Sequence, residues 1–361
     1  MTSRRGFLAG LLASSLAPTP SWADLGRPAF LTAAKDPDGR YLLAGLSETG
    51  AIQFTCPLPG RGHAAAAHPT RPEAVAFARR PGRFADVIDC RNGAPLARLE
   101  PPQGHHFYGH GLFTPDGSRL FTTENDYENG RGRIGIWHVA EGYRRFGSFG
   151  SGGIGPHDML LRHSQGGPQL AIANGGIETH PDSGRAKLNL PQMRPNICLL
   201  SLEGEVLEEM ELGPDLHLNS IRHLALSSQG IVGFAMQWQG DPSADLPLLG
   251  LYEPGRSARL LAEGDPRLRN MRGYGGSVAF SPDDQAIAVT SPRGGVVQVM
   301  ETNSGNLIQE HALRDVCGLA TARSGLIAST GLGEIAVLTG RLAKQLKHHD
   351  LAWDNHLVPL T

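Results

Sequence analysis

The sequence predicts an all-β fold, a seven-bladed β-propeller closed by its C-terminal strand. Three observations support this prediction: the chain of 361 residues is rich in glycine (47) and proline (26), its apolar runs are short and separated by turn signals, and one strand–turn–strand phrase recurs. All-β chains of this length often form a single unit. A phrase that recurs every forty-odd residues, with about four short strands in each repeat, is typical of a propeller blade.

The recurring phrase consists of a strand, a turn of the Pro-Asp-Gly kind and a second strand. Its clearest turns are Pro115-Asp116-Gly117 and Ser281-Pro282-Asp283. The longest interval between two phrases contains an insertion, residues 175–194, between two strands of its blade. Six innermost strands are therefore predicted to begin where the phrase begins, at His63, His110, His157, His223, Gly276 and Cys317.

The two ends of the chain complete a seventh blade. Residues 41–56 parallel residues 296–309, so both segments are predicted to be the third and fourth strands of a blade. Residues 30–34 then form a second strand, which leaves the first blade without an innermost one. Residues 356–360 can supply it, starting at His356, and such closure hides the sheet edges that an open ring would expose.

The first 23 residues are predicted to be a twin-arginine signal peptide, and residues 24–361 the propeller domain. Arg4 and Arg5 precede an apolar run, and Ser21-Trp22-Ala23 has the pattern of a cleavage site, so the mature chain is expected to start near Asp24. The alternative is an ordinary basic N-terminus before a buried helix. Export by this route predicts a periplasmic protein, and no other stretch is long and apolar enough to span a membrane.

Composition excludes several classes of partner and site. The formal net charge is −2 and no basic stripe occurs, so nucleic acid is not expected, because phosphate binding needs clustered lysine and arginine. Four cysteines stand singly, at Cys56, Cys90, Cys198 and Cys317, a spacing that gives neither a thiolate zinc site nor covalent haem attachment. In an oxidising compartment one pair could form a disulfide. We expect a monomer.

Histidine occupies five of the seven predicted starts of innermost strands. Because these strands all enter the channel from the same face, residues at their starts should form a ring at one mouth. Imidazole nitrogen is a ligand for zinc, copper, iron and nickel. The sequence therefore predicts a transition-metal site, iron or copper, whose ligands are His63, His110, His157, His223 and His356.

Two other interpretations of these histidines remain open. In WD-repeat propellers a Gly-His dipeptide occupies this position and the histidine hydrogen-bonds within its own blade; Gly62-His63 and Gly109-His110 fit that pattern. The Trp-Asp partner expected at the end of the third strand is absent from those blades. The remaining interpretation is substrate binding or acid–base chemistry.

Polar residues between the second and third strands of several blades should return to the same mouth. The insertion at residues 175–194 could close over the site as a lid, since long loops often carry function, or it could be a solvated surface loop. The residues expected to contribute to binding a cofactor are Glu124, Asn174, Glu178, His180, Arg185 and Lys187. Glu124, Asn125, Asn174 and Asn219 could also mimic the calcium site of a lactonase-type propeller.

Seven segments of the chain resemble a family of exported bacterial proteins without a settled activity. They are residues 108–111, 123–127, 155–158, 173–181, 184–190, 220–224 and 273–277. Genes of that family tend to lie beside those for imelysin-type periplasmic proteins and di-haem oxidases, in clusters linked to iron uptake. The resemblance covers nearly the whole mature chain, and it implies a role in periplasmic iron or copper handling with other metal-uptake proteins as partners.

A looser likeness is to nitrous-oxide reductase and cytochrome-type propellers, which hold copper clusters or haem at a histidine-rich mouth. With histidine at only five of seven positions, a multinuclear copper cluster of that type is not expected here. The leading function is metal binding for iron or copper acquisition. The alternatives are a metal-dependent enzyme, either a hydrolase or an oxidoreductase, and an interaction scaffold in an uptake complex.

Overall fold

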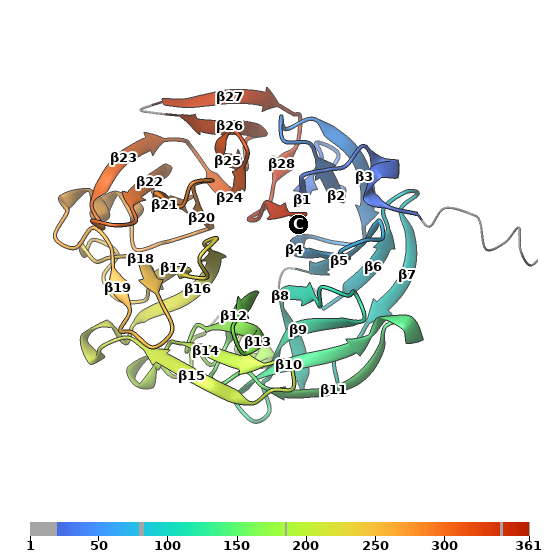
Figure 1. The fold of residues 1–361 in the computed structure, drawn as a ribbon, viewed down its shortest axis with the longest axis horizontal. Helices are drawn as coiled ribbons and strands as arrows, with labels where there is room; N and C mark the ends of the chain where they lie inside the picture. The colour runs from blue at the N-terminus through green and yellow to red at the C-terminus, as the bar shows by residue number, and fades with distance from the viewer. Residues whose placement is uncertain (1–19, 79–82, 185, 340–341, 361) are drawn as a thin grey trace, which may run out of the picture.

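Seven antiparallel sheets surround a central channel in the computed structural model, which describes residues 20–78, 83–184, 186–339 and 342–360. The sheets follow one another around the ring in chain order, from blue to red in Figure 1. Each blade has four strands running outward from the channel, except that two short strands share the innermost place in the first blade. The predicted seven-bladed propeller is confirmed.

Blades 1 to 4 follow the chain from its N-terminus. Blade 1 contains β28 (Ala352–Trp353), β29 (Val358–Pro359), β1 (Phe30–Lys35), β2 (Tyr41–Leu46) and β3 (Ile52–Leu58). Blade 2 contains β4 (Gly62–Ala67), β5 (Glu73–Ala78), β6 (Ala85–Asp89) and β7 (Ala94–Leu99). Blade 3 contains β8 (His105–Phe113), β9 (Arg119–Asp126), β10 (Arg131–His138) and β11 (Arg144–Gly150). Blade 4 contains β12 (Pro156–Ser164), β13 (Gly167–Asn174), β14 (Asn196–Ser201) and β15 (Val206–Glu211).

The remaining three blades complete the ring. Blade 5 contains β16 (Asn219–Leu226), β17 (Val232–Trp238), β18 (Leu249–Tyr252) and β19 (Arg259–Leu260). Blade 6 contains β20 (Val278–Phe280), β21 (Ala286–Ser291), β22 (Val296–Glu301) and β23 (Leu307–Ala312). Blade 7 contains β24 (Val316–Ala322), β25 (Gly325–Thr330), β26 (Glu334–Thr339) and β27 (Leu342–His348).

The helices of the described residues are short 3₁₀ turns. They are η1 (Trp22–Leu25), η2 (Val139–Glu141), η3 (Pro181–Ser183), η4 (Leu190–Gln192), η5 (Pro214–Leu216) and η6 (Pro266–Met271). Two of them, η3 and η4, lie in the predicted insertion between β13 and β14. Within the described residues no helix has the length and apolar character that a membrane crossing needs.

The position of a strand in its blade explains its sequence. Middle strands such as β5 and β13 are buried along most of their length, because neighbouring blades cover both of their faces. Outer strands such as β15 are largely exposed and carry charged residues. Between blades 2 and 3, Phe77, Phe107 and Trp137 pack in one buried cluster. This packing holds adjacent sheets in fixed positions, so the starts of the innermost strands are held in place as well.

The predicted Pro-Asp-Gly turns form as tight hairpins. In the turn between β8 and β9, the Asp116 carboxylate accepts hydrogen bonds from the hydroxyl of Thr114 at 2.5 Å and from the backbone N–H of Ser118 at 3.0 Å. Gly117 takes a φ of +68°, which glycine adopts without steric cost. These hydrogen bonds lower the pKa of Asp116 to about 2, the largest effect being that of Thr114.

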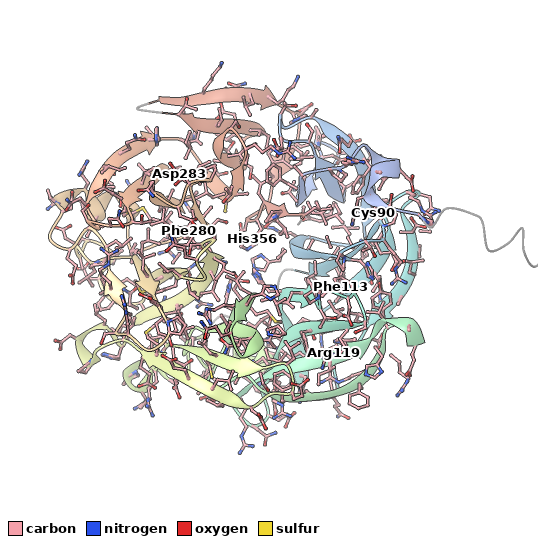
Figure 2. The ribbon with its side chains drawn as sticks, viewed as in Figure 1. Cys90, Phe113, Arg119, Phe280, Asp283 and His356 are labelled. Atoms are coloured by element: carbon pink, nitrogen blue, oxygen red, sulfur yellow. The ribbon has the colours of Figure 1, made fainter. Side chains whose placement is uncertain are left out.

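The C-terminal segment closes the ring. β28 pairs with β1 through Trp353 and Ala34, and β29 pairs with β1 through Pro359 and Phe30. The predicted closure is therefore confirmed, although two short strands replace the single strand expected from His356 onward. His356 lies between them, close to the axis in Figure 2.

The expected signal peptide lies largely outside the described residues, which begin at residue 20. The expected cleavage site coincides with the start of η1. Here the indole of Trp22 stacks on Phe54 with ring centroids 6.4 Å apart, and its Nε1–H donates to the backbone oxygen of His68 at 2.8 Å.

All four cysteines are free thiols in the structure. Cys56 in β3 and Cys90 after β6 are buried, and the Cys56 thiol donates to the backbone oxygen of Cys90 at 3.9 Å, so the two residues are neighbours across two adjacent blades.

Candidate metal centre

Each innermost strand that carries a histidine from blade 2 to blade 5 departs from regular pairing close to that histidine. The register shifts between Gly62 and Ala65, between Phe107 and Gly111, between Pro156 and Asp158, and between Ile221 and His223. An extra residue in a strand bends it and redirects its side chains, and such bulges are common next to functional sites. The bulges explain how consecutive side chains of one strand can both face the channel.

Five imidazoles meet at the channel axis in a compact group, which we call the histidine cluster: His63, His110, His157, His223 and His356. The distances between neighbouring ring centroids are 5.0 Å for His63–His110, 5.3 Å for His110–His157 and 4.7 Å for His157–His223. His356 lies 4.7 Å from His223, 4.7 Å from His63 and 4.8 Å from His110. The structure thus brings together all five histidines predicted to be ligands.

The ring nitrogens approach each other closely enough to share an ion. Two sets of three, His63–His110–His356 and His110–His157–His223, each offer nitrogens within 4.8 Å of one another. His110 belongs to both sets. Nε2 of His110 and Nδ1 of His157 are buried and have no hydrogen-bond partner in the described part of the chain. Since buried polar atoms are nearly always hydrogen-bonded, these two nitrogens need an explanation.

Burial keeps His157 neutral. Desolvation is the main cause that lowers the pKa of His157 well below its ordinary value, and repulsion by His223 and Arg222 adds to it. A neutral imidazole has a lone pair available for a metal, whereas a protonated one does not.

Asp158 is a part of the site that the sequence did not predict. Its carboxylate lies 3.0 Å from Nδ1 of His110 and accepts hydrogen bonds from the backbone N–H of Leu224 at 3.0 Å and of Met159 at 2.8 Å. Burial opposes its charge, but attraction by His110 and these hydrogen bonds outweigh burial, so the pKa of Asp158 is lowered. Its position directly after His157 is the only signal in the sequence.

The histidine cluster separates two cavities along the channel. The inner cavity, about 640 Å³, is lined mainly by apolar side chains of the innermost strands, such as Leu160, Leu226 and Leu319. The outer cavity, about 300 Å³, lies at the end where these strands begin and is lined by polar side chains. His110 and His356 face the inner cavity, His63 and His157 the outer one, and His223 both. The cluster therefore lies inside the channel, beneath the predicted mouth.

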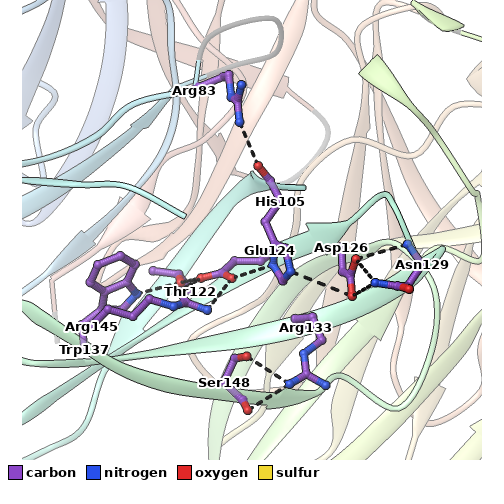
Figure 3. A network of polar contacts seen from close by, with 10 residues as sticks. All are labelled: Arg83, His105, Thr122, Glu124, Asp126, Asn129, Arg133, Trp137, Arg145 and Ser148. Carbon is purple, nitrogen blue, oxygen red and sulfur yellow. Dashed lines mark hydrogen bonds and ion pairs between the residues drawn. The ribbon is translucent and has the colours of Figure 1, made fainter. Parts of the chain in front are cut away.

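Glu124 and Asn174 are not brought to the histidine cluster. Glu124 belongs to β9 instead of a loop; it is fully buried and forms a two-point ion pair with Arg145, including a 2.9 Å contact to Nη2, and accepts a hydrogen bond from Thr122 (Figure 3). Asn174 is equally buried and donates to Asn196 at 2.8 Å. Both side chains are engaged within their own blades. The other two residues of the calcium alternative, Asn125 and Asn219, donate to the backbone oxygens of Thr179 at 3.1 Å and Pro247 at 2.9 Å.

His105 belongs to the same blade interior as Glu124. Its Nδ1 lies 3.4 Å from the Glu124 carboxylate, and the residue is the first of β8 (Figure 3). β8 therefore begins five residues before His110.

The insertion contributes one of its four predicted residues to the mouth. Lys187 lines the outer cavity. Glu178 and His180 do not line either cavity; His180 instead caps η3 by accepting the backbone N–H of Asp182. Arg185 lies outside the described residues. The sequence missed Arg222 and Tyr108, which line the outer cavity and precede His223 and His110 by one and two residues.

Comparison with known proteins identifies the family. The model of DUF1513, described as a protein of unknown function, matches residues 56–360. The chain belongs to this family. No relative was found among curated protein sequences.

Solved structures share the fold of this DUF1513 protein. Hydrazine synthase of Kuenenia stuttgartiensis has a TM-score of 0.60 at 11% identity, covering 84% of this chain and 93% of that one. A functionally unknown protein from Desulfotomaculum acetoxidans has a TM-score of 0.58 at 12% identity, covering 92% and 98%. At such identities the similarity establishes the fold alone.

Proposed function

We propose that this DUF1513 protein binds a first-row transition-metal ion, iron or copper, in its histidine cluster and takes part in acquiring or transferring that ion outside the cytoplasm. The observation that carries the proposal is the convergence of five imidazoles from five blades, with two buried nitrogens of His110 and His157 that lack a hydrogen-bond partner in the described residues.

The donor set selects the class of metal. Neutral imidazoles suit iron, copper, nickel and zinc, whereas calcium and magnesium prefer carboxylate and carbonyl oxygens. Metal–nitrogen bonds are about 2.0–2.1 Å long, so nitrogens now within 4.8 Å of one another need only a small inward rotation of their rings. A carboxylate on the second nitrogen of a histidine ligand orients the ring and raises its basicity. Asp158 is in position to do this for His110.

The proposed location rests on the N-terminal segment, with Arg4 and Arg5 before an apolar run and a cleavage pattern at residues 21–23. Export would give a periplasmic protein with metal-uptake proteins of the imelysin type as partners. The test is N-terminal sequencing of the protein from the periplasmic fraction. A mature start near Asp24, and retention of an Arg4→Lys, Arg5→Lys variant in the cytoplasm, support export; an unprocessed chain in the cytoplasm contradicts it.

The metal proposal is tested by elemental analysis of the purified protein, followed by titration of the metal-free protein with copper(II) and iron(II). We expect about one equivalent of transition metal. A His110→Ala, His157→Ala, His223→Ala variant should lose at least a hundredfold in affinity. His217→Ala is the matched control, because His217 is partly exposed, lies outside the histidine cluster and has its Nδ1 2.8 Å from the backbone oxygen of Pro214. A folded protein that takes up no metal, or a triple variant with unchanged affinity, contradicts the proposal.

A further inference from the structure

The outer cavity differs from a site built for a bare cation. Among the residues that the structure describes, its lining includes the cationic side chains of Lys187 and Arg222, the two tyrosines Tyr108 and Tyr274, and no carboxylate. Asp158, the acidic residue next to the histidine cluster, faces the inner cavity instead. A cation approaching from this side meets positive charge first, whereas an anion meets donors from several blades.

A third cation strengthens the positive charge at this mouth. The Arg293 guanidinium lies over the ring of Tyr274, 4.6 Å from its centroid. Partial desolvation lowers the pKa of Lys187, which is an exposed residue, and repulsion by Arg222 and by Arg293 lowers it further, so both arginines lie close enough to act on the ammonium. The Lys187 ammonium donates to Oε1 of Gln239 at 2.5 Å, a neutral group that leaves its charge in place.

The cavity also has direct access to the cluster. His63, His157 and His223 lie in its wall, so a ligand held by Lys187 and Arg222 would be in contact with imidazoles. Its volume of about 300 Å³ is at the lower end of the range for small-molecule sites. Clusters of preorganised cations and hydrogen-bond donors recognise carboxylate and phosphate groups.

We propose that the outer cavity binds a small anion with carboxylate or phosphate oxygens, and that the histidine cluster receives its metal as a complex with such an anion. The delivery of metal as an anion complex rests on the proposed function, whereas the binding of the anion itself does not. The anion lies between the cations of Lys187 and Arg222 on one side and the ion in the cluster on the other, and its oxygens supply ligands that the imidazoles leave vacant.

The first experiment titrates the metal-free protein by calorimetry with citrate and, separately, with inorganic phosphate, at constant ionic strength. Binding is expected for at least one of them, and the tighter of the two identifies the class of anion. Lys187→Gln and Arg222→Gln should each weaken it at least tenfold, Lys187→Arg should restore most of it, and Lys35→Gln, on the exposed end of β1, should not change it. No binding of either anion, or binding unchanged in Lys187→Gln, overturns the proposal.

The second experiment separates this inference from the proposed function. Metal-free protein is titrated with copper(II) sulfate and with preformed copper(II) citrate. The Lys187→Gln variant should bind the aqua ion as the unaltered protein does and lose at least tenfold in affinity for the citrate complex. Equal losses for both forms, or none for either, overturn the inference while the histidine cluster remains a metal site. If neither protein binds copper in any form but the first experiment shows anion binding that depends on Lys187, the proposed function fails and the anion site stands.

Discussion

Nδ1 of His110 lies 3.0 Å from the carboxylate of Asp158, and this contact joins blades 3 and 4 at the wall of the channel. Because His110 belongs to both sets of three histidines, the residue that orients it affects the whole cluster. Asp158→Asn keeps the size of the side chain and an oxygen acceptor but removes the charge.

We expect Asp158→Asn to weaken metal binding about tenfold or more, the usual effect of losing a carboxylate behind a histidine ligand. The measurement is a competition titration with a chromophoric chelator. Asp182→Asn serves as the control, since the side chain of Asp182 is 92% exposed in the insertion. Equal affinities of the Asp158→Asn variant and the unaltered protein would show that His110 does not depend on Asp158.

His68 makes the stability of the fold depend on pH. Its Nδ1 accepts the backbone N–H groups of Thr70 at 3.2 Å and Arg71 at 3.1 Å, and burial, with repulsion by Arg71, lowers its pKa below the ordinary value of 6.5. Below pH 6.5 the unfolded chain therefore takes up a proton that the folded chain does not, so stability is complete above that pH and falls as the pH drops.

A His68→Asn variant tests this, because asparagine offers an oxygen acceptor for the same turn and does not titrate. Urea unfolding between pH 7.5 and 5 should show that the variant loses less stability than the unaltered protein as the pH falls. The two slopes of unfolding free energy against pH should differ by at most about 1.4 kcal/mol per pH unit. His157 and His311, whose pKa values burial also lowers, contribute to the remaining slope in both proteins. Identical slopes would rule out a contribution from His68.

Glu124 and Arg145 form an ion pair in the blade interior, and replacing only one of the two residues should lower the stability of the fold. Arg145→Ala would leave the carboxylate of Glu124, which is 0% exposed, without its charge partner, and we expect a loss of about 3–5 kcal/mol in the free energy of unfolding. Arg256→Ala, which breaks an exposed pair with Glu253, should cost less than about 1 kcal/mol. A Glu124→Gln variant that folds should bind metal with unchanged affinity. A loss of metal affinity in the folded variant would show that Glu124 contributes to the metal site.

Gly109 lies directly against His63. It has a φ of +105°, and a Cβ atom added there would lie 2.5 Å from Cδ2 of the His63 ring. Gly109→Ala should therefore both strain the backbone, at about 1–3 kcal/mol, and displace one imidazole. Gly147→Ala, in open space on β11, is the matched control. Metal titration and urea unfolding check the two effects, and normal metal affinity in Gly109→Ala would place His63 outside the ligand set.

Cys56 and Cys90 should form a disulfide under mild oxidation, for example with oxidised glutathione. The two residues are already in contact, and the bond would join positions 34 apart in the sequence, in blades 1 and 2, a stabilisation of about 2–4 kcal/mol. Cys198 should remain reduced, since burial raises its pKa to about 12 and thiolates are the reactive form. Mass spectrometry of the protease-digested protein checks the pairing, and a different pair, or none, would contradict it.

The histidine cluster could be predicted from the sequence because two regularities coincide: a motif recurs every forty to fifty residues or so, and most of its copies begin with histidine. It did not predict which polar groups would accompany them. Glu124 was expected in a loop because the sequence does not show how far a hairpin extends; pairing with β8 and β10 continues through Glu124 to Asp126. Asp158 and Arg222 face the channel because bulges redirect their strands, and a bulge depends on long-range pairing that local sequence does not reveal.

The segment that closes the propeller also carries its fifth imidazole. His356 stands between the two short strands that attach the end of the chain to β1, and its ring is 4.7 Å from His63 and 4.8 Å from His110. An ion shared by these residues would act as a clasp between the last residues of the chain and blades 2 and 3. Metal binding and closure of the propeller would then be coupled. The metal would slow the detachment of the C-terminus, and a chain cleaved before residue 352 would lose both the closing strands and the bound metal.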